Sequence, residues 1–211
     1  MSIHSVHQGQ PIKTLGEKLE TAKAAMILLH GRGDSAQGIL SLVPEITMPG
    51  FAYGAPNAAG QVWYPNRFIE PLSHNEPNLS SALEVLDWLV EHVCEHVAKE
   101  KVIILGFSQG SCLALEYAAR TGGRFGAIIG LSGGLIGDVL EPTRYKNLEG
   151  TPVFLGCSDV DAHIPKSRVD ETAVILEGLG AKVDKRIYPN FGHTVNADEL
   201  EAVRELMRNL I

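Results

Sequence analysis

The stretch VIILGFSQGSCLAL, from Val102 to Leu115, decides the fold. Four apolar residues run into the motif Gly-Phe-Ser-Gln-Gly, and a second apolar stretch follows it. The first run predicts a buried strand that ends at the motif, and the second predicts a helix over 108–121. Ser108 therefore stands at a sharp turn between two buried segments, whereas a serine in a linker would have polar neighbours.

This strand, Gly-x-Ser-x-Gly turn and helix form the nucleophile-elbow pattern of α/β hydrolases. The serine of such a turn adopts a strained backbone conformation, and Gly106 and Gly110 leave room for the chain that packs against it. The turn exposes the serine hydroxyl at the top of the sheet, where the helix N-terminus favours developing negative charge. Ser108 is therefore the candidate nucleophile.

Apolar runs alternate with helical patterns along the rest of the chain. Strands are expected at 24–31, 50–58, 101–107, 125–134, 151–159 and 181–189. Helices are expected at 35–43, from a capping box at 81–84 onward, at 108–121, 166–179 and 197–210. The pattern predicts one α/β domain over 1–211, a mostly parallel sheet covered by helices on both faces, with a minimal cap domain or none. Ligands of such sheets bind at the carboxyl ends of the strands.

A serine nucleophile needs a base, which a carboxylate usually orients. In α/β hydrolases these partners follow the serine in the order acid, then histidine. Asp159 and Asp161 follow the strand at 151–159, and His193 lies in a glycine-containing loop before the last helix. The chain order is satisfied, but spacing alone leaves both aspartates open, and capping of the following segment is the alternative for each.

The oxyanion of a tetrahedral intermediate needs backbone N–H donors. One is expected from Gln109, directly after the nucleophile. The segment LLHGRGD, at 28–34, is the candidate for the other, because its glycines let the backbone approach the reacting carbonyl. The His30 ring is expected to hold this loop by hydrogen bonds rather than to take part in the chemistry.

With these segments assembled, the chain resembles the phospholipase/carboxylesterase family of α/β hydrolases, which includes acyl-protein thioesterases. The matching segments are LLHGRGD, APNA, ILGFSQGSCLAL, GLSGGL, GCSDVDAHIP and YPNFGH, which run from residue 27 to the last helix. The resemblance implies Ser108 as nucleophile, His193 as base and Asp161 as acid. It selects Asp161 because the acid of the family lies four residues before a proline, here Pro165.

The resemblance also implies oxyanion donors at the backbones of Arg32 and Gln109, and it implies neither a metal nor an organic cofactor. An apolar residue is common in the family where Arg32 stands, so its side chain is expected to add positive charge at the pocket mouth. The segment QVWYPNRFIEPLSHNEP, at 61–77, does not match acyl-protein thioesterases. This difference favours a serine carboxylesterase acting on small to medium acyl esters. An acyl thioesterase or lysophospholipase and a non-catalytic binding module are the alternatives.

The long loop at 57–78 is rich in proline and asparagine, as lids and substrate-binding loops often are. Trp63, Tyr64 and Phe68 are expected to line an apolar acyl or alcohol pocket there. The alternative is that these aromatic side chains anchor the loop to the domain surface.

The segment HVCEH, at 92–96, matches the H-x-x-E-H pattern of some zinc peptidases. On a helical wheel, however, the apolar residues define the buried face, Glu95 points nearly opposite, and both histidines lie on the solvent flank. A catalytic zinc needs ligands that face a cleft and a third ligand. We therefore expect no metal site.

The chain of 211 residues carries a formal net charge of −7 and has three scattered cysteines without a C-x-x-C pair. These features argue against nucleic-acid binding and favour a reducing compartment. No apolar run reaches the roughly 18 residues of a membrane span, and no signal-peptide pattern is visible. We expect a cytoplasmic protein whose partner is a small-molecule ester, without stable membrane insertion. A homodimer stays open.

Overall fold

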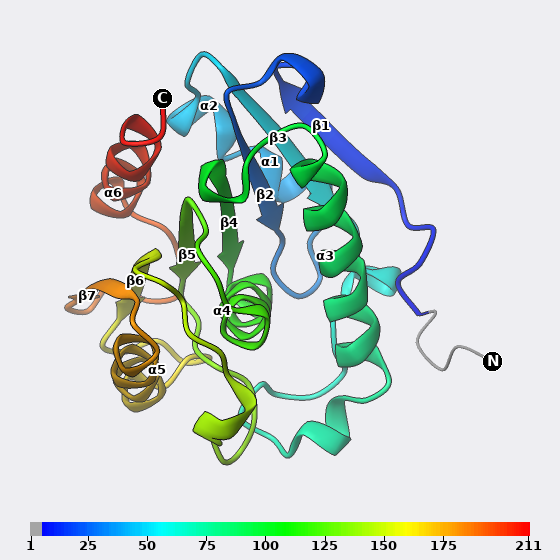
Figure 1. Ribbon diagram of the computed structural model, residues 1–211. Helices are drawn as coiled ribbons and strands as arrows, with labels where there is room; N and C mark the ends of the chain where they lie inside the picture. The colour runs from blue at the N-terminus through cyan, green and yellow to red at the C-terminus, as the bar shows by residue number, and fades with distance from the viewer. Residues whose placement is uncertain (1–5) are drawn as a thin grey trace.

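A computed structural model describes residues 6–211 and contains one seven-stranded sheet (Figure 1). The strands are β1 (Ile12–Gly16), β2 (Ala24–Leu29), β3 (Phe51–Pro56), β4 (Val102–Phe107), β5 (Ala127–Leu131), β6 (Pro152–Ser158) and β7 (Lys182–Tyr188). Their order is β1-β3-β2-β4-β5-β6-β7. Only β1 runs antiparallel to its neighbour, β3, and the other pairs are parallel. The prediction of a mostly parallel sheet is confirmed.

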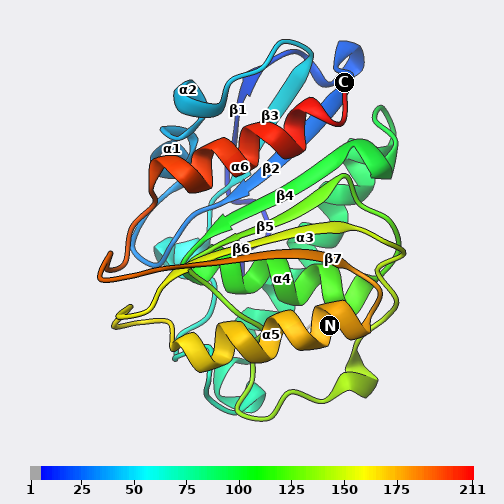
Figure 2. The same ribbon diagram turned by 90° about the vertical axis from the view of Figure 1, so that its left-hand side faces the viewer.

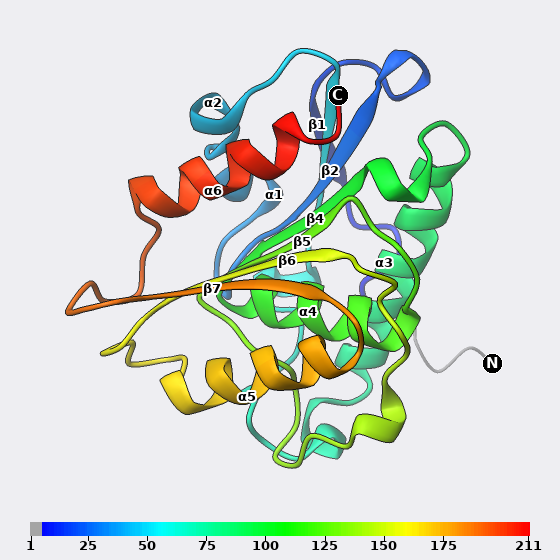
Figure 3. The ribbon, with the colours of Figure 1, turned by 60° about the vertical axis from the view of Figure 1, so that its left-hand side comes forward.

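Helices cover both faces of this sheet, as Figures 2 and 3 show. They are α1 (Ala36–Leu40), α2 (Val43–Ile46), α3 (Asn78–Cys94), α4 (Gln109–Thr121), α5 (Lys166–Gly178) and α6 (Ala197–Arg208). Helices α1, α2 and α6 lie on one face, and α3, α4 and α5 lie on the other. Within residues 6–211 no separate cap domain lies over the sheet, and none of the helices has the length and apolar character needed to span a bilayer.

The layers explain why the central strands are apolar at every position. Along β4, Val102 and Ile104 belong to the core under α3, α4 and α5, whereas Ile103 and Leu105 belong to the core under α1, α2 and α6. Successive side chains of a strand point to opposite faces, so a strand buried on both faces needs an unbroken apolar run. Because both of its faces are apolar, β4 suits the centre of the sheet, where it is the fourth of seven strands. The turn that follows β4 therefore lies at the middle of the carboxyl edge of the sheet.

Helix α3 begins three residues before the expected capping box, so that prediction was wrong. Glu76 Oε2 accepts the Ser80 N–H at 3.0 Å and satisfies one of the first free donors of the helix. The Ser81 hydroxyl, buried inside the first turns, instead accepts the backbone N–H of His7 at 2.9 Å. A true capping box opens α6, where Asn196 and Glu199 exchange both bonds.

The loop at 57–78 is short of regular structure but closely packed. It contains two 3₁₀ turns, Ala59–Gln61 and Leu72–Asn75, and runs beside the carboxyl ends of the strands. Buried His7 pins its start, because the ring accepts the Ala59 N–H at 3.0 Å and lies 2.9 Å from the Trp63 carbonyl oxygen. These bonds tie the start of the loop to the segment before β1.

Candidate active site

Ser108 sits at the turn between β4 and α4, as the motif predicted. Its backbone has φ 55° and ψ −118°, a region that side-chain-bearing residues rarely adopt. A Cβ atom on Gly106 would collide with the carbonyl of Gly110, and one on Gly110 would collide with the carbonyl of Leu29. The two glycines are therefore needed because strand and helix cross too closely for any side chain, and this crossing lifts Ser108 out of the sheet.

His193 and Asp161 extend from the serine in one line of hydrogen bonds. His193 Nε2 lies 2.8 Å from Ser108 Oγ, and His193 Nδ1 lies 2.7 Å from Asp161 Oδ2. The carboxylate can only accept, so Nδ1 carries the proton and Nε2 is free to accept from the serine hydroxyl. The structure thus brings together three side chains from separate loops at the carboxyl ends of β4, β6 and β7.

The two aspartates after β6 have different tasks. The Asp161 side chain is fully buried, and its Oδ1 accepts the N–H groups of His163 at 2.8 Å and Ile164 at 3.0 Å. Burial alone would raise the pKa of Asp161, but the hydrogen bonds from His193 and these two N–H groups outweigh it and lower the pKa. Exposed Asp159 instead accepts the Asn190 N–H at 2.8 Å. It holds the histidine loop and does not contact the imidazole.

A buried hydroxyl fixes the loop that carries His193. Ser158, the last residue of β6, is 2% exposed, and its Oγ accepts the N–H groups of Val160, Phe191 and Gly192 at 3.2, 3.2 and 3.0 Å. Sequence reasoning missed this residue. Its position at the end of a strand beside the candidate acid was the one available signal, because two of its three partners lie more than 30 residues away.

Two rings flank the imidazole of His193. The Phe107 ring centroid lies 5.0 Å away, and the His163 ring centroid lies 4.7 Å away on a tilted plane. Such contacts restrict rotation of the imidazole and so preserve both of its hydrogen bonds. His163, which the sequence placed only near the acid, is thus part of the cavity wall.

The loop after β2 lies beside Ser108 with its N–H groups available. Gln109 is the first residue of α4, so its N–H has no carbonyl one turn earlier to accept it. Gly33 and Asp34 donate their N–H groups within the loops, to Gln61 and Gly31. The Arg32 N–H, by contrast, donates to no group in the described part of the chain. Both expected oxyanion donors are therefore free.

His30 has the role expected of it. Its Nε2 accepts the Ala58 N–H at 3.1 Å, and its Nδ1 lies 2.7 Å from the Gly31 carbonyl oxygen. This arrangement requires a neutral ring with the proton on Nδ1. Burial lowers the pKa of His30 and favours that neutral form. The ring therefore ties the loop after β2 to the residues after β3.

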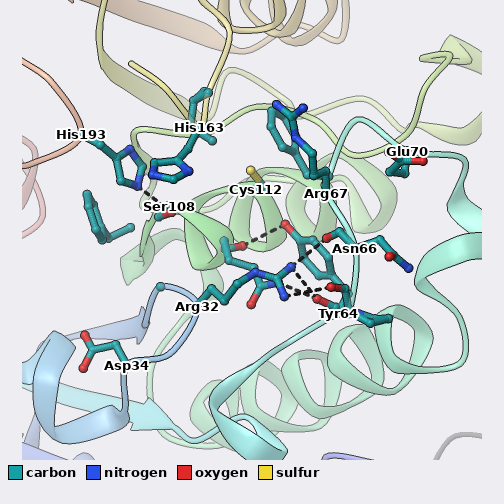
Figure 4. Close-up of a pocket in the computed structure, with 16 residues that line it drawn as sticks. Arg32, Asp34, Tyr64, Asn66, Arg67, Glu70, Ser108, Cys112, His163 and His193 are labelled. Atoms are coloured by element: carbon teal, nitrogen blue, oxygen red, sulfur yellow. Dashed lines mark hydrogen bonds between the residues drawn. The ribbon is translucent and has the colours of Figure 1, made fainter. Parts of the chain in front are cut away.

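A cavity of about 570 Å³ opens beside Ser108 (Figure 4). It is lined by Gly31, Arg32, Asp34, Tyr64, Pro65, Asn66, Arg67, Phe68, Glu70, Phe107, Ser108, Gln109, Cys112, His163, Ile164 and His193. Its volume is within the range of small-molecule sites, roughly 300–1,000 Å³. Burial raises the pKa of the Cys112 thiol to about 12, so this thiol is neutral near pH 7 and does not compete with the serine as a nucleophile.

The structure separates the three aromatic residues expected to bind substrate. Tyr64 and Phe68 line the cavity, although little of either side chain is exposed. Trp63 is fully buried outside the lining, where its Nε1 donates to the His30 carbonyl at 2.9 Å. Its backbone N–H donates to Gln109 Oε1 at 2.9 Å. Trp63 therefore anchors the loop, which was the alternative role weighed for it, because its indole N–H needs a buried acceptor.

The Arg32 side chain does not project freely into the pocket mouth. Its guanidinium donates to the carbonyl oxygens of Tyr64 at 2.9 Å, Pro65 at 2.9 Å and Asn66 at 2.7 Å (Figure 4). Its charge remains near the cavity, but most of its donors are committed to the loop.

The described residues offer no cluster for a metal ion. Within 6–211, no group of three or more His, Cys, Asp or Glu side chains is arranged to hold one. His92 and His96 lie on α3 and just after it with their rings 6.2 Å apart, and His92 is partly paired with Glu95 at the surface. His92, Glu95 and His96 are therefore exposed to solvent, and none of them lines the cavity beside Ser108.

Known proteins of one family resemble this chain over most of its length. A family model described as Phospholipase/Carboxylesterase matches residues 12–211. Acyl-protein thioesterase 1 of Candida albicans is 29% identical over 217 residues, covering 90% of this chain and 94% of that protein. Lysophospholipase-like protein 1 of Mus musculus is 28% identical over 204 residues, covering 86% of this chain and 84% of that protein.

Solved structures show the same architecture. The crystal structure of a phospholipase/carboxylesterase from Dyadobacter fermentans has a TM-score of 0.91 and 38% identity, and covers 95% of this chain and 97% of that chain. The structure of esterase PE8 has a TM-score of 0.78 at 24% identity, covers 96% of this chain and 98% of that chain, and shows likeness of fold. The expected α/β-hydrolase fold is confirmed.

Proposed function

The chain belongs to the phospholipase/carboxylesterase family of serine hydrolases, and we propose that it is a carboxylesterase that cleaves small to medium acyl esters at Ser108. The observation that carries this proposal is the line of hydrogen bonds from Asp161 through His193 to the serine. A hydroxyl becomes a competent nucleophile only when a positioned base takes its proton. The cavity of about 570 Å³ beside it has room for a substrate of this size.

In the proposed reaction, Ser108 Oγ attacks the ester carbonyl while His193 Nε2 takes the hydroxyl proton. Asp161 holds the imidazole in the required tautomer and stabilises its cation. The N–H groups of Arg32 and Gln109 stabilise the oxyanion. His193 then gives the proton to the leaving alkoxide, which departs as an alcohol and leaves an acyl-serine. A water molecule, deprotonated by the same imidazole, releases the carboxylic acid and restores the serine.

A matched pair of aspartate variants tests this assignment. Asp161→Asn should lower kcat for a p-nitrophenyl ester by about 10³- to 10⁴-fold: the two backbone N–H groups hold the amide oxygen, so the NH2 group faces His193 Nδ1 and favours the wrong tautomer. Asp159→Asn should change kcat little, because the amide oxygen can still accept the Asn190 N–H. A fluorophosphonate probe should label the wild type and not Ser108→Ala. An unlabelled wild type, or equal losses in the two aspartate variants, would refute the proposed function.

Thioesters are the second candidate substrate, because several relatives carry the name acyl-protein thioesterase 1. The same serine, base and oxyanion donors would serve either leaving group. Oxygen esters and thioesters with the same acyl chain should be compared by kcat/KM, together with a lysophospholipid. We expect the oxygen ester to be preferred. A clear preference for the thioester or the lysophospholipid would replace the carboxylesterase assignment without affecting the roles of the three residues.

A further inference from the structure

Two arginine side chains line the catalytic cavity, and they use their charge differently. Arg32 commits its guanidinium to three loop carbonyls, which are neutral and so do not cancel its charge. The Arg67 carbonyl accepts Asn75 Nδ2 at 3.1 Å, which fixes the backbone. The Arg67 guanidinium, however, forms no hydrogen bond or ion pair with any residue from 6 to 211. Its planar set of N–H donors is therefore available to a ligand.

The carboxylates of the cavity wall do not neutralise Arg67. Glu70 Oε2 lies 3.4 Å from His74 Nδ1, outside the cavity lining, and forms no ion pair with Arg67 among residues 6–211. Figure 4 shows Asp34 and Glu70 at opposite edges of the cavity lining, with Ser108 and Arg67 between them. Seen from Arg67, Asp34 lies on the far side of Arg32. The part of the wall at Arg67 therefore keeps its positive charge.

We propose that Arg67 forms an anion subsite, and that the preferred ester carries an oxyanion, a carboxylate or a phosphate, at the end remote from the scissile bond. This inference rests on the proposed function, because the ester must be held at Ser108 for the subsite to act. A guanidinium binds such groups through two parallel N–H···O bonds. Tyr64, Phe68 and Ile164 line the same cavity and supply apolar contacts for the stem of the substrate.

A charge-matched series of p-nitrophenyl acyl esters tests the subsite. In the first set, three acyl chains of equal length end in a carboxylate, a phosphonate or a neutral methyl ester. In the second set, the acyl chain is kept constant and the nitrophenol leaving group carries either a carboxylate or its methyl ester. Wild type should prefer an anionic member, in kcat/KM, in at least one of these two sets. The carboxylate and phosphonate arms distinguish the two sources of the oxyanion.

Arg67→Gln should lower this anionic-to-neutral ratio by about tenfold, which corresponds to the low end for a hydrogen bond to a charged group. Its kcat/KM on neutral esters should fall clearly less than its kcat/KM on the anionic ones, since only the anionic group loses a charged partner. Arg67→Lys should retain most of the preference, and Arg208→Gln, on exposed α6, is the matched control that should retain all of it. Added salt should weaken the preference in wild type.

The outcomes separate the subsite from the proposed function. If wild type is labelled by the fluorophosphonate and cleaves the neutral esters, but Arg67→Gln has an unchanged ratio, the subsite is refuted and the esterase stands. Equal losses on anionic and neutral esters in Arg67→Gln would also refute it, because they would indicate a damaged wall. If wild type is neither labelled nor active on any member, the proposed function and the subsite fall together.

Discussion

The position of His193, the proposed base, depends on the hydroxyl of Ser158, which does not line the cavity. Ser158 Oγ accepts three N–H groups, two of them from the loop just before His193. An acceptor buried at that point fixes the loop more firmly than water would, because a buried donor without a partner costs about 1–3 kcal/mol. We therefore assign Ser158 as a positioning residue.

Ser158→Ala should lower kcat about ten- to a hundredfold, because small displacements of a catalytic group have effects of this size. KM for a neutral ester should change little, since Ser158 does not line the cavity. Ser111→Ala is the matched control: its buried hydroxyl has no hydrogen-bond partner among residues 6–211, and its loss should leave kcat near wild type. Steady-state kinetics of both variants decide, and a Ser158→Ala enzyme with unchanged kcat contradicts the assignment.

At this scale the sequence predicted chemistry better than contacts. Ser108 was predicted from the nucleophile-elbow motif, and His193 from the chain order of α/β hydrolases, in which the histidine follows the acid. Spacing could not separate Asp159 from Asp161, since both follow the same strand. The path of the chain after the strand decides which aspartate reaches the imidazole. The sequence does not show this path, so the choice of Asp161 came only from the resemblance to the family. The unpartnered guanidinium of Arg67 depends on contacts that no local pattern records.

The loop at 57–78 is the element that shapes the cavity, and a buried asparagine holds it. Asn75 is fully buried, accepts the Asn66 N–H at 2.8 Å through Oδ1 and donates to the Arg67 carbonyl at 3.1 Å through Nδ2. The Gln109 side chain adds a second tie by donating to the Tyr64 carbonyl at 2.7 Å. These amide groups replace the regular hydrogen bonds that a loop lacks.

Asn75→Ala should destabilise the protein and weaken ester binding together. The part-buried N–H of Asn66 loses its acceptor and the Arg67 carbonyl loses one of its two donors, at about 1 kcal/mol for each lost hydrogen bond, so the melting temperature should fall by several degrees. KM for neutral esters should rise, because the wall at 64–68 loses its support. Asn209→Ala, at the exposed end of α6, is the control that should leave both quantities unchanged. A normal melting temperature with normal KM would show that the loop is held by other contacts.

Strands were predicted best where burial was uniform, although the half-exposed edge strand β7 was also expected, at 181–189. The five central strands were recognised because both of their faces are buried. Strand β1 was missed because Ile12–Gly16 is an edge strand with a mostly exposed face, so it carries no apolar run. The start of α3 was misplaced because a capping pattern at 81–84 is indistinguishable, within the sequence, from a serine that accepts a distant N–H.

Across the whole molecule, one buried carboxyl couples folding to pH. Glu199 in α6 is 1% exposed, and burial raises its pKa to about 7, against the lowering effect of the Asn196 N–H and with some help from Asp198. The native state therefore binds this proton more tightly than the unfolded state does. The stability it contributes is complete below about pH 4.5 and is lost as pH rises toward and past 7.

Glu199→Gln isolates this effect. The difference in unfolding free energy, wild type minus variant, should fall by about 3 kcal/mol between pH 4.5 and 8. Burial lowers the pKa of His7 and of His30, which acts in the opposite direction with pH, but both terms cancel in the difference. Glu205→Gln, on the exposed side of the same helix, is the control. Denaturant unfolding at several pH values measures both, and a flat difference curve would contradict the raised pKa.

Arg32 has two attachments whose joint effect reaches beyond either. In the proposed reaction its main chain donates to the oxyanion, while its side chain donates to three carbonyl oxygens of the loop at 64–66 that lines the cavity. Substitutions made in that loop to change the substrate should therefore alter kcat as well as KM. Attempts to broaden the substrate range should leave the stretch from Tyr64 to Asn66 alone and begin further along the chain.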